Sequence, residues 1–326
     1  MVVPTLAADD ALAECLRSLE KQTFDRFEVI VVDNSGAKRA QAGARVHVIA
    51  NERNVGFGAA VNQAILASQS PYVVTLNDDA VADPHWLEKL AAAADARPQA
   101  GMCASEVRMA DSGLLDSAGM LMAIDGSSKQ RGHGESPAKF ATQRDALFPS
   151  GSAALYRRKM LDEIGLFDQS FFLYCEDTDL GMRARWAGWE CAYVPGAIVE
   201  HRYSHSAGRA TPLKAYFVER NRLYAAIKNF PWPNVALVHV AGNLRYWWHW
   251  ITMLEGRGKA SEYRESGHSL GMLIFLTFRA HFAVLYRLPE LWRARRRILR
   301  TRRISRAAFR QLLKQYSISL RRVAEL

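Results

Sequence analysis

Three short polar segments of the chain each follow an apolar run. They are Asp33-Asn34-Ser35 after FEVIVV, Asn77-Asp78-Asp79 after YVVTL, and Glu176-Asp177-Thr178-Asp179 after FFLYC. In an open parallel sheet the carboxyl ends of the strands meet at one edge, and ligands bind there. We therefore expect all three segments at one ligand-binding edge.

The second segment places two carboxylates, Asp78 and Asp79, next to each other after a buried strand. Adjacent like charges repel unless a cation lies between them or one is protonated. Mg²⁺ and Mn²⁺ prefer oxygen ligands and bridge to phosphates. The alternative is a solvated turn or a helix cap, but Asp83 before Pro84 already supplies a cap. This pattern predicts a divalent metal site.

The other two segments allow a functional and a structural interpretation. The carboxylate of Asp33 can accept a hydrogen bond from a nucleobase, although DNSG is also good turn chemistry. Glu176 and Asp177 open a predicted helix, where acids stabilise the macrodipole. An ionised acid there can also act as general base for an incoming hydroxyl.

Two further segments lie between or after these acids. Asn54, Gly56 and Gly58 lie where a predicted helix opens. The glycines let backbone approach a phosphate, but no third glycine follows, which disfavours a Rossmann dehydrogenase. His201 and His205 follow the last predicted strand and are candidates for metal ligation or for a structural role.

Strand and helix patterns alternate through the first two hundred residues. We expect strands at 2–4, 27–32, 45–50, 72–76 and 191–194, helices from 10, at 57–68, 83–96, 158–164 and 177–187, and irregular strands and loops at 100–134. The alternation predicts right-handed crossovers and a doubly wound α/β sheet.

The chain changes character after about residue 206. Helices are predicted at 213–229, 235–254 and 268–288, followed by the basic run RARRRILRTRRISR. Tryptophan side chains favour the lipid headgroup level of a membrane. Arg279 and Arg287 suit a helix that lies in the membrane interface better than one that crosses the bilayer. The prediction is contact with an anionic membrane surface; a soluble helical subdomain or a dimer interface is the alternative, and nucleic-acid binding is disfavoured.

Composition sets the broad class. The chain has 326 residues, 49% hydrophobic residues and a formal net charge of +10, which excludes disorder and fibrous repeats. Its four cysteines form no CxxC pair and are expected to be free thiols. The amino-terminal residues carry no signal-peptide pattern.

Longer blocks resemble glycosyltransferase family 2, and within it the bacterial rhamnosyltransferase-like branch. These blocks cover about residues 2–230 and occur in the same order as in the family. They are PTL, VVDNS, NVGFGAAVN, LNDDA, SGSAALYRR, IGLFDQSFFLYCEDTDLGMRARWAGW, His201 and ERNRL. The resemblance implies a GT-A fold, the Rossmann-like sheet of nucleotide-diphospho-sugar transferases, at 1–205, and a helical, basic, membrane-associating region at 206–326.

The same resemblance implies inverting, metal-dependent transfer of a sugar from a nucleoside diphosphate. The favoured donor is dTDP-rhamnose, with a UDP-sugar as the alternative, and the cofactor is Mg²⁺ or Mn²⁺. A lipid-linked or cell-envelope glycan would be the acceptor. The expected location is peripheral, on the cytoplasmic face of the inner membrane, and a homo-oligomer is left open.

The resemblance also assigns roles to individual residues. Asp177 matches the catalytic base with Glu176 orienting the acceptor, and Asp79 and His201 match metal ligands. The donor nucleotide would be bound by Pro4, Thr5, Asp33, Asn54, Gly56, Gly58, Asn77 and Asp78, and phosphate or acceptor by Gly151, Arg220 and Asn221. Asn77 replaces the first aspartate of the family's DxD motif, which lowers the charge of the metal site by one.

Two other functions fit the sequence less well. A nucleotidyltransferase would need a basic glycine-rich segment near the amino terminus, and LAADDALAE is not one. A catalytically inactive, membrane-bound GT-A-like scaffold would not need Asp33, Asp79, Asp177 and His201 together. We expect Asp79 and Asp177 to converge on one activated sugar.

Overall fold

The computed structural model describes residues 1–6, 9–202 and 211–326, and the chain forms two compact units. Unit 1 comprises Met1–Met120, Gln130–Leu173 and Trp189–Ser206. Unit 2 comprises Leu121–Lys129, Tyr174–Gly188 and Ala207–Leu326. The domain boundary that we expect between residues 205 and 206 stays a prediction.

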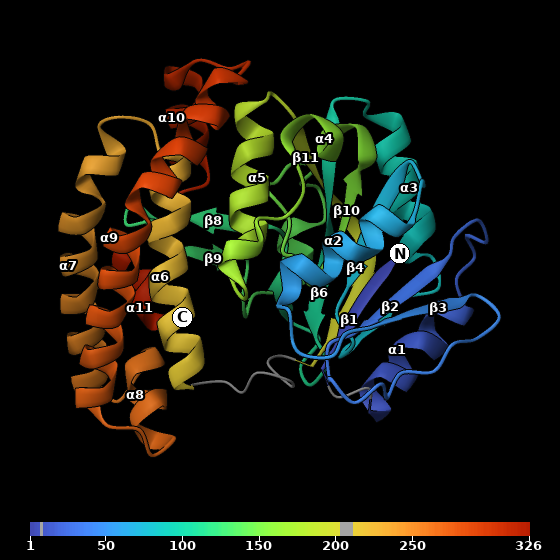
Figure 1. Cartoon of the computed structure of the whole chain (residues 1–326), viewed down its shortest axis with the longest axis horizontal. Helices are drawn as coiled ribbons and strands as arrows, with labels where there is room; N and C mark the ends of the chain where they lie inside the picture. The colour runs from blue at the N-terminus through green and yellow to red at the C-terminus, as the bar shows by residue number, and fades with distance from the viewer. Residues whose placement is uncertain (7–8, 203–210) are drawn as a thin grey trace. The chain divides into compact units, whose positions relative to one another are not determined.

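A nine-stranded mixed sheet forms the centre of unit 1 (Figure 1). Its order is β3-β2-β1-β4-β10-β6-β11-β5, with β7 paired to β6. The strands are β1 (Val2–Thr5), β2 (Val29–Asp33), β3 (Val46–Ala50), β4 (Tyr72–Leu76), β5 (Ala80–Ala82), β6 (Ala100–Met109), β7 (Leu115–Ser117), β10 (Ala153–Arg157) and β11 (Glu190–His201). The α/β fold is confirmed.

The sheet departs from the expected parallel arrangement. β10 runs antiparallel between β4 and β6, and β5 runs antiparallel to β11. The strand β6 lies inside the sheet, between β10 and β11, in the segment for which irregular strands and loops are predicted. Its polar residues are satisfied by distant partners: Ser105 accepts from the Trp86 indole N–H at 2.8 Å, and Glu106 from the Gly196 N–H at 2.9 Å. Such long-range partners are invisible in the local sequence pattern.

Four helices pack on this sheet. They are α1 (Asp10–Glu20), α2 (Phe57–Ala67), α3 (Trp86–Ala96) and α4 (Arg158–Ile164), with short 3₁₀ turns at Pro137–Phe140 and Gln169–Phe171. Asp9 caps α1 by accepting from Ala11 N–H at 3.1 Å. Asp83 was expected to cap α3 but does not, because it accepts from His85 N–H in a turn and the helix begins only at Trp86.

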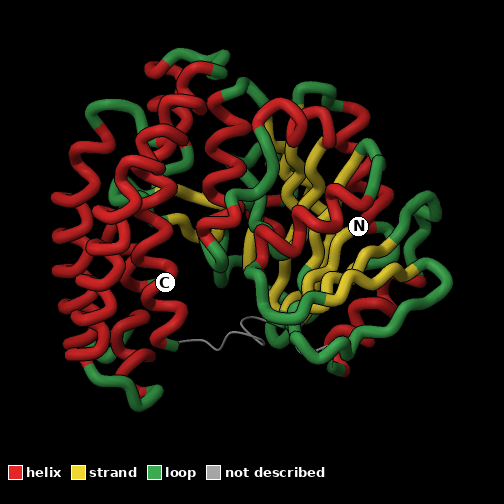
Figure 2. The backbone as a smooth tube through the Cα atoms, in the orientation of Figure 1, coloured by secondary structure: helices red, strands yellow, loops and turns green. Residues whose placement is uncertain are grey.

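Unit 2 consists mainly of helices, drawn red in Figure 2. They are α5 (Glu176–Trp186), α6 (Pro212–Asn229), α7 (Asn234–Leu254), α8 (Gly258–Glu265), α9 (Leu270–Arg300), α10 (Arg306–Gln315) and α11 (Leu320–Glu325). α6 packs along α9, and α11 packs on α7. The short strands β8 (Met120–Met122) and β9 (Ser128–Gln130) pair with each other, and the link between them belongs to unit 2.

The helix α9 continues twelve residues beyond its predicted end at 288. Pro289 lies inside the helix, and arginines dominate its last three turns. By length and composition, α9 is apolar enough to cross a membrane. Arg279 and Arg287 interrupt the apolar run, as the sequence indicated.

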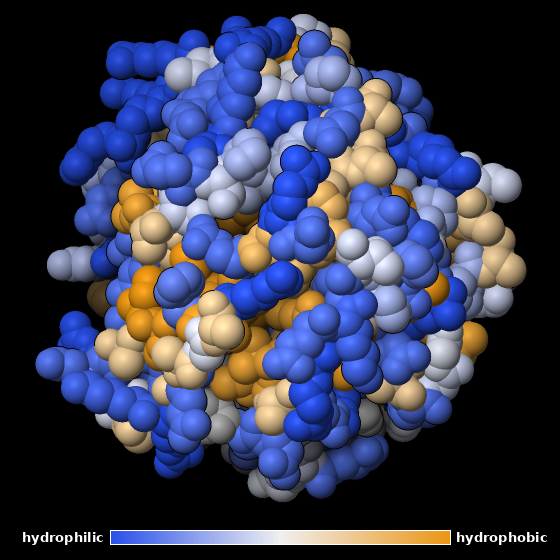
Figure 3. Space-filling model, turned by 90° about the vertical axis from the view of Figure 1, so that its right-hand side faces the viewer, coloured by the Kyte–Doolittle hydropathy of each residue, from blue (hydrophilic) through white to orange (hydrophobic). Residues whose placement is uncertain are grey.

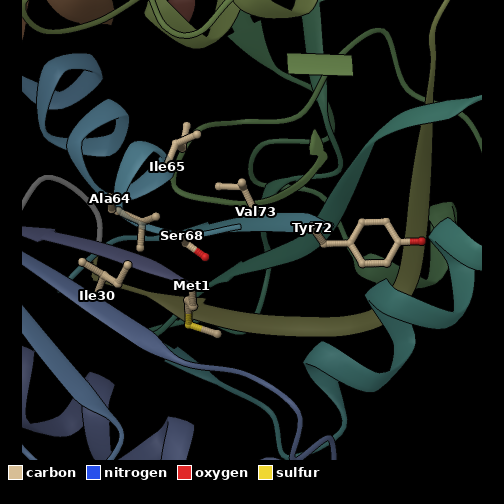
Figure 4. Close-up of a pocket in the computed structure, with 8 residues that line it drawn as sticks. Met1, Ile30, Ala64, Ile65, Ser68, Tyr72 and Val73 are labelled. Atoms are coloured by element: carbon tan, nitrogen blue, oxygen red, sulfur yellow. The ribbon is translucent and has the colours of Figure 1, made fainter. Parts of the chain in front are cut away.

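The surface carries both hydrophilic and apolar areas. The face shown in Figure 3 is mostly hydrophilic, with hydrophobic side chains gathered in one area. A small apolar hollow in unit 1, shown in Figure 4, is lined by residues that include Met1, Ile30, Ile65 and Val73. Because Met1 precedes β1 and Ile30 and Val73 are second residues of their strands, this hollow lies away from the carboxyl ends that carry the acids.

Candidate functional site

The carboxyl ends of the central strands in unit 1 hold the first group of predicted residues. The parallel register pairs Thr5 of β1 with Asp33 of β2, so both lie at one level of the sheet. Pro4 precedes Thr5 in β1, and Asn77 directly follows β4. The backbone N–H of Asn77 donates to Ser152 O at 2.8 Å, which fixes the turn that leads into Asp78.

Asp78 and Asp79 are both nearly buried, with 7% and 6% of their surface exposed. Burial raises the pKa of Asp78, the Thr5 side chain opposes this by hydrogen bonding to it, and the charge of Asp79 raises the pKa further. The two carboxylates thus repel each other in a poorly solvated place. This is the electrostatic situation that the sequence predicted.

Sheet pairing brings His201 to Asp79 across 122 residues of sequence. In the antiparallel β5–β11 ladder His201 is opposite Ala80, the residue after Asp79. His201 Nε2 lies 3.2 Å from Asp79 Oδ1 and 3.3 Å from Asn77 Nδ2. Asp79, Asn77 and His201 therefore form one cluster in unit 1.

Asp116 of β7 completes this cluster, although no motif in the sequence points to this residue. Its Oδ2 lies 3.1 Å from His201 Nδ1, and its Oδ1 lies 3.2 Å from His133 Nδ1. Burial alone would raise the pKa of Asp116, but its bonds to His133 and His201 lower it to about 2. Asp116 is thus a buried carboxylate that orients the His201 ring so that Nε2 faces Asp79.

The protonation of His201 follows from these two acids. Burial alone would lower the pKa of His201, but Asp116 and Asp79 together raise it to about 10. A positive charge is therefore stabilised at the position between them. A proton on His201 can supply this charge, and a metal cation is the other way to supply it.

Asp33 is held by its own loop. Its Oδ1 accepts from Ser35 N–H at 2.8 Å and its Oδ2 accepts from Ala40 N–H at 2.9 Å. Burial raises the pKa of Asp33, but these backbone bonds lower it by more, so the group is ionised. The turn interpretation is thus realised in the structure, and nucleobase recognition by Asp33 stays a prediction.

The glycine segment makes a close approach within unit 1. Gly56 precedes α2 with φ 87°, and a Cβ placed on it would lie 2.4 Å from Phe172 O. That carbonyl accepts from Phe57 N–H at 2.8 Å, and Asn54 Oδ1 accepts from Gly56 N–H at 2.8 Å. Gly58 is buried inside α2. In the structure Gly56 therefore makes room for backbone, and a donor role for these three residues stays a prediction.

The second group of predicted residues lies in unit 2, at the start of α5. Glu176 is buried, its Oε2 makes no hydrogen bond within the described residues, and burial with the charge of Asp177 raises its pKa to about 8. Asp177 is partly exposed and its Oδ1 accepts from Thr178 N–H at 2.6 Å. The pair thus offers one neutral and one hydrogen-bonded carboxyl group, the separation of roles typical of acid–base sites.

The backbone just before α5 is strained. Tyr174 and Cys175 have φ values of 68° and 64°, in the left-handed region that non-glycine residues rarely adopt. Asn221 of α6, fully buried, holds this turn by donating from Nδ2 to Tyr174 O at 2.8 Å. Strained turns of this kind concentrate at functional sites.

The remaining predicted residues are placed as follows. Arg220 of α6 lies 4.7 Å from the Phe217 ring and 5.0 Å from the Tyr224 ring, and donates to Asn221 Oδ1. Gly151 lies in a turn before β10 in unit 1. His205 lies outside the described residues. The convergence of Asp79 and Asp177, which belong to different units, stays a prediction.

The mixed sheet, with acids at the carboxyl end of β4, defines a GT-A fold. A known protein with a similar fold is GalNAc-T7, solved with UDP, GalNAc and Mn²⁺: the TM-score is 0.59 at 12% identity, covering 74% of this chain and 49% of that one. At this identity the likeness concerns the fold alone.

Residues 1–165 match the family described as "Glycosyl transferase family 2". The chain belongs to this family, and it is a glycosyltransferase, as the resemblance implied. It is 29% identical to the N-acetylglucosaminyl-diphospho-decaprenol L-rhamnosyltransferase of Mycobacterium tuberculosis (strain ATCC 25618 / H37Rv), over 64% of this chain and 77% of that protein. It is 39% identical to rhamnosyltransferase WbbL of Escherichia coli (strain K12) over 21% of this chain and 25% of that protein.

The close contact of Gly56 gives a stability prediction. We expect Gly56→Ala to lower the free energy of unfolding by about 1–3 kcal/mol for the backbone conformation, φ 87° and ψ 162°, and by about 1–3 kcal/mol more for the clash with Phe172. Gly113→Ala is the matched control, because Gly113 also has positive φ but open space around its Cβ position. Urea unfolding followed by fluorescence would measure both, and equal losses in the two variants would contradict the contact.

Proposed function

We propose that this glycosyltransferase is an inverting enzyme that moves rhamnose from dTDP-rhamnose to a polyprenyl-diphosphate-linked amino sugar. The proposal is carried by one observation: the buried Asp79–His201–Asp116 cluster forms at the carboxyl edge of the sheet, in a chain similar to a mycobacterial rhamnosyltransferase. The relative's name supplies both the rhamnose and the lipid diphosphate.

A divalent cation, Mg²⁺ or Mn²⁺, fits the residues present. Asp79 Oδ1 is buried without a well-formed hydrogen bond in the described part of the chain, and His201 Nε2 lies close to it. An oxygen and an imidazole nitrogen are donors that Mn²⁺ accepts. Among the described residues, no three His, Cys, Asp or Glu side chains are placed so that together they could hold one metal ion, so Asp79 and His201 would leave other coordination positions to donor phosphates. When bound, the cation would offset negative charge on the departing diphosphate.

Asp177 is proposed as the general base. It would take the proton of the acceptor hydroxyl as that oxygen attacks the anomeric carbon from the face opposite the diphosphate. Glu176 is neutral at pH 7 because its pKa is raised to about 8, so it can donate a hydrogen bond to the acceptor. This division of roles matches the buried and partly exposed positions of the two side chains.

Unit 2 exposes apolar side chains on two of its helices, as an interfacial membrane contact would require. We call its exposed side chains the apolar stripe: Leu237, Val240, Leu244, Trp247, Trp250 and Leu254 on α7, and Met272, Ile274, Phe275, Phe278, Phe282, Leu285, Tyr286 and Leu288 on α9. The two helices approach each other at His239 and His281, whose ring centroids lie 6.0 Å apart. With the arginines that end α9, the stripe supports peripheral attachment to the cytoplasmic face of the inner membrane.

The assignment of the base predicts a specific loss. Asp177→Asn is expected to keep donor affinity and to lose about 10²–10⁴-fold in transfer, because only proton removal is impaired. The measurement is transfer from dTDP-rhamnose to a polyprenyl-diphosphate N-acetylglucosamine, with donor affinity by calorimetry. Asp162→Asn, an exposed acid on α4, is the control. Full activity in Asp177→Asn would refute the role, and transfer from UDP-sugars only would refute the donor.

The orientation of His201 by Asp116 predicts a metal-binding effect. Asp116→Asn is expected to weaken Mn²⁺ binding by about 10–100-fold, because carboxylate partners orient and strengthen histidine ligands. Calorimetric titration of the protein with Mn²⁺, without donor or acceptor, measures this directly. Asp111→Asn, in the exposed loop before β7, should leave affinity unchanged. Equal affinities in the two variants would remove Asp116 from the site.

The apolar stripe predicts membrane binding. Phe278 and Phe282 are 73% and 72% exposed, so replacing both with serine should reduce flotation with phosphatidylglycerol vesicles at least about tenfold. Leu66→Ser is the matched control, because Leu66 of α2 is 72% exposed but lies in unit 1. If flotation is unchanged while a dimer is lost on gel filtration, the stripe is a subunit interface instead.

A further inference from the structure

The proposed base, Asp177, and its neighbour Glu176 follow an unusual start of α5. Tyr174 and Cys175, the two residues before them, both have left-handed backbone, with φ values of 68° and 64°. Cys175 directly precedes the helix, and its side chain makes no capping hydrogen bond. A common N-cap residue has extended backbone and a side-chain oxygen that accepts from the first turn of its helix. The start of α5 therefore depends on support from outside its own residues.

Asn221 of α6 supplies such support within unit 2. Its Nδ2 donates to Tyr174 O at 2.8 Å, and its Oδ1 accepts from Arg220 Nε at 2.8 Å. A guanidinium group only donates and a backbone carbonyl only accepts, so these two partners fix which end of the amide faces which. The side chain of Asn221 is fully buried. Its amide thus joins Arg220 to the left-handed turn in a single orientation.

Aromatic rings of α6 restrict Arg220 in turn. Its guanidinium carbon lies 4.7 Å from the ring centroid of Phe217, 5.0 Å from that of Tyr224 and 5.6 Å from that of Tyr216. These rings lie three or four positions from Arg220 along the helix, so all of these side chains share one helix face. Aromatic faces attract a guanidinium group. The rings therefore help to keep Arg220 Nε at the Asn221 amide.

The hydrogen bond to Tyr174 O acts on the backbone of the turn itself. This carbonyl belongs to the peptide group that joins Tyr174 to Cys175, so a bond to it restricts the dihedral angles on both sides of that group. Rare backbone conformations persist only where surrounding contacts hold them. Without the bond, we expect both residues to relax toward the right-handed region, which would change the direction in which Asp177 leaves the turn.

We propose that Asn221, oriented by Arg220, is a positioning residue for Asp177, because it holds the left-handed turn that sets where this carboxylate lies. The role of Asp177 as base rests on the proposed function; the support of the turn rests on the contacts of Asn221. This role differs from the phosphate or acceptor contact that the family resemblance implies for Arg220 and Asn221. A displaced base slows the reaction and leaves substrate binding unchanged, so the two roles have different kinetic consequences.

The test measures initial rates with the whole protein, from dTDP-rhamnose to a polyprenyl-diphosphate N-acetylglucosamine. Asn221→Asp keeps an acceptor for Arg220 and removes the donor to Tyr174 O. It is expected to lower kcat about 10–100-fold, as a base displaced by about 1 Å would, with both KM values within about threefold of the wild type. Arg220→Met, which leaves Asn221 in place but no longer oriented, should lower kcat by a smaller factor at the same KM values.

A second substitution distinguishes support of the turn from contact with a ligand. Glycine adopts left-handed backbone at little cost, so adding Cys175→Gly to Asn221→Asp should raise kcat at least about fivefold over Asn221→Asp alone. The matched control is Asn229→Ala. Asn229 is equally buried on α6 and donates to the Asp179 side chain of α5 at 2.9 Å, not to the turn, so this variant should keep the kcat of the wild type.

Four results would each overturn the proposal. The first is an unchanged kcat in Asn221→Asp. The second is a rise in the KM for donor or acceptor in Asn221→Asp or Arg220→Met at unchanged kcat, which would assign these residues to a ligand. The third is an equal loss of kcat in Asn229→Ala, which would indicate general damage to α5. The fourth is a double variant no faster than Asn221→Asp.

Hydrogen exchange separates this proposal from the proposed function, because it needs no substrate. In the first turn of α5, Asp179 N–H donates to Cys175 O at 2.9 Å. Asn221→Asp should speed exchange of the amides in this turn at least about tenfold, because the turn opens more often. Faster exchange in a protein that transfers no rhamnose would count against the proposed reaction alone. Rhamnose transfer with unchanged exchange in Asn221→Asp would count against the support of the turn alone.

Discussion

Compensation of buried carboxylates is the constraint on which both units depend. A carboxylate removed from water is costly unless an opposite charge or several hydrogen-bond donors meet it. In unit 1, His201 lies between Asp79 and Asp116. In unit 2, Asp179 of α5 meets Arg183 and Lys228, while Asp125 and Glu219 meet two arginines. Where compensation is incomplete, as at Asp78 and Glu176, the structure marks places where a ligand can supply what the chain does not.

Much of the fold could be predicted from local patterns. Continuous β-branched runs predicted β2 and β4, and the glycine after Ile164 predicted the end of α4, because these signals act within a few residues. Strands and loops were predicted for residues 100–134, but the position and length of β6 were not, since its polar residues depend on partners from α3 and β11. The antiparallel insertion of β10 was missed for a related reason: strand direction is set by the whole sheet, and no single segment encodes it.

The candidate site was predictable to the same extent. Asp78, Asp79 and His201 could be found because acids after an apolar strand and a histidine after the last strand are visible in the sequence and match family blocks. Asp116 could not, because it lies in a segment without a motif, and its significance comes from His133 and His201, of which His201 lies far along the chain. Charge pairing is a property of the assembled unit, and a sequence read linearly does not reveal which charged groups meet.

Pro289 within α9 has a mechanical consequence. Proline has no N–H, so the carbonyl of Leu285, four residues earlier, lacks its usual intrahelical partner. A helix weakened at one such point bends there at lower cost than elsewhere. Pro289 divides the aromatic first part of α9 from the arginine-rich last part, so the two parts can tilt independently of each other. On the membrane surface that we propose for this helix, such a bend would let the protein follow changes of curvature with both its aromatic and its arginine side chains in contact with lipid.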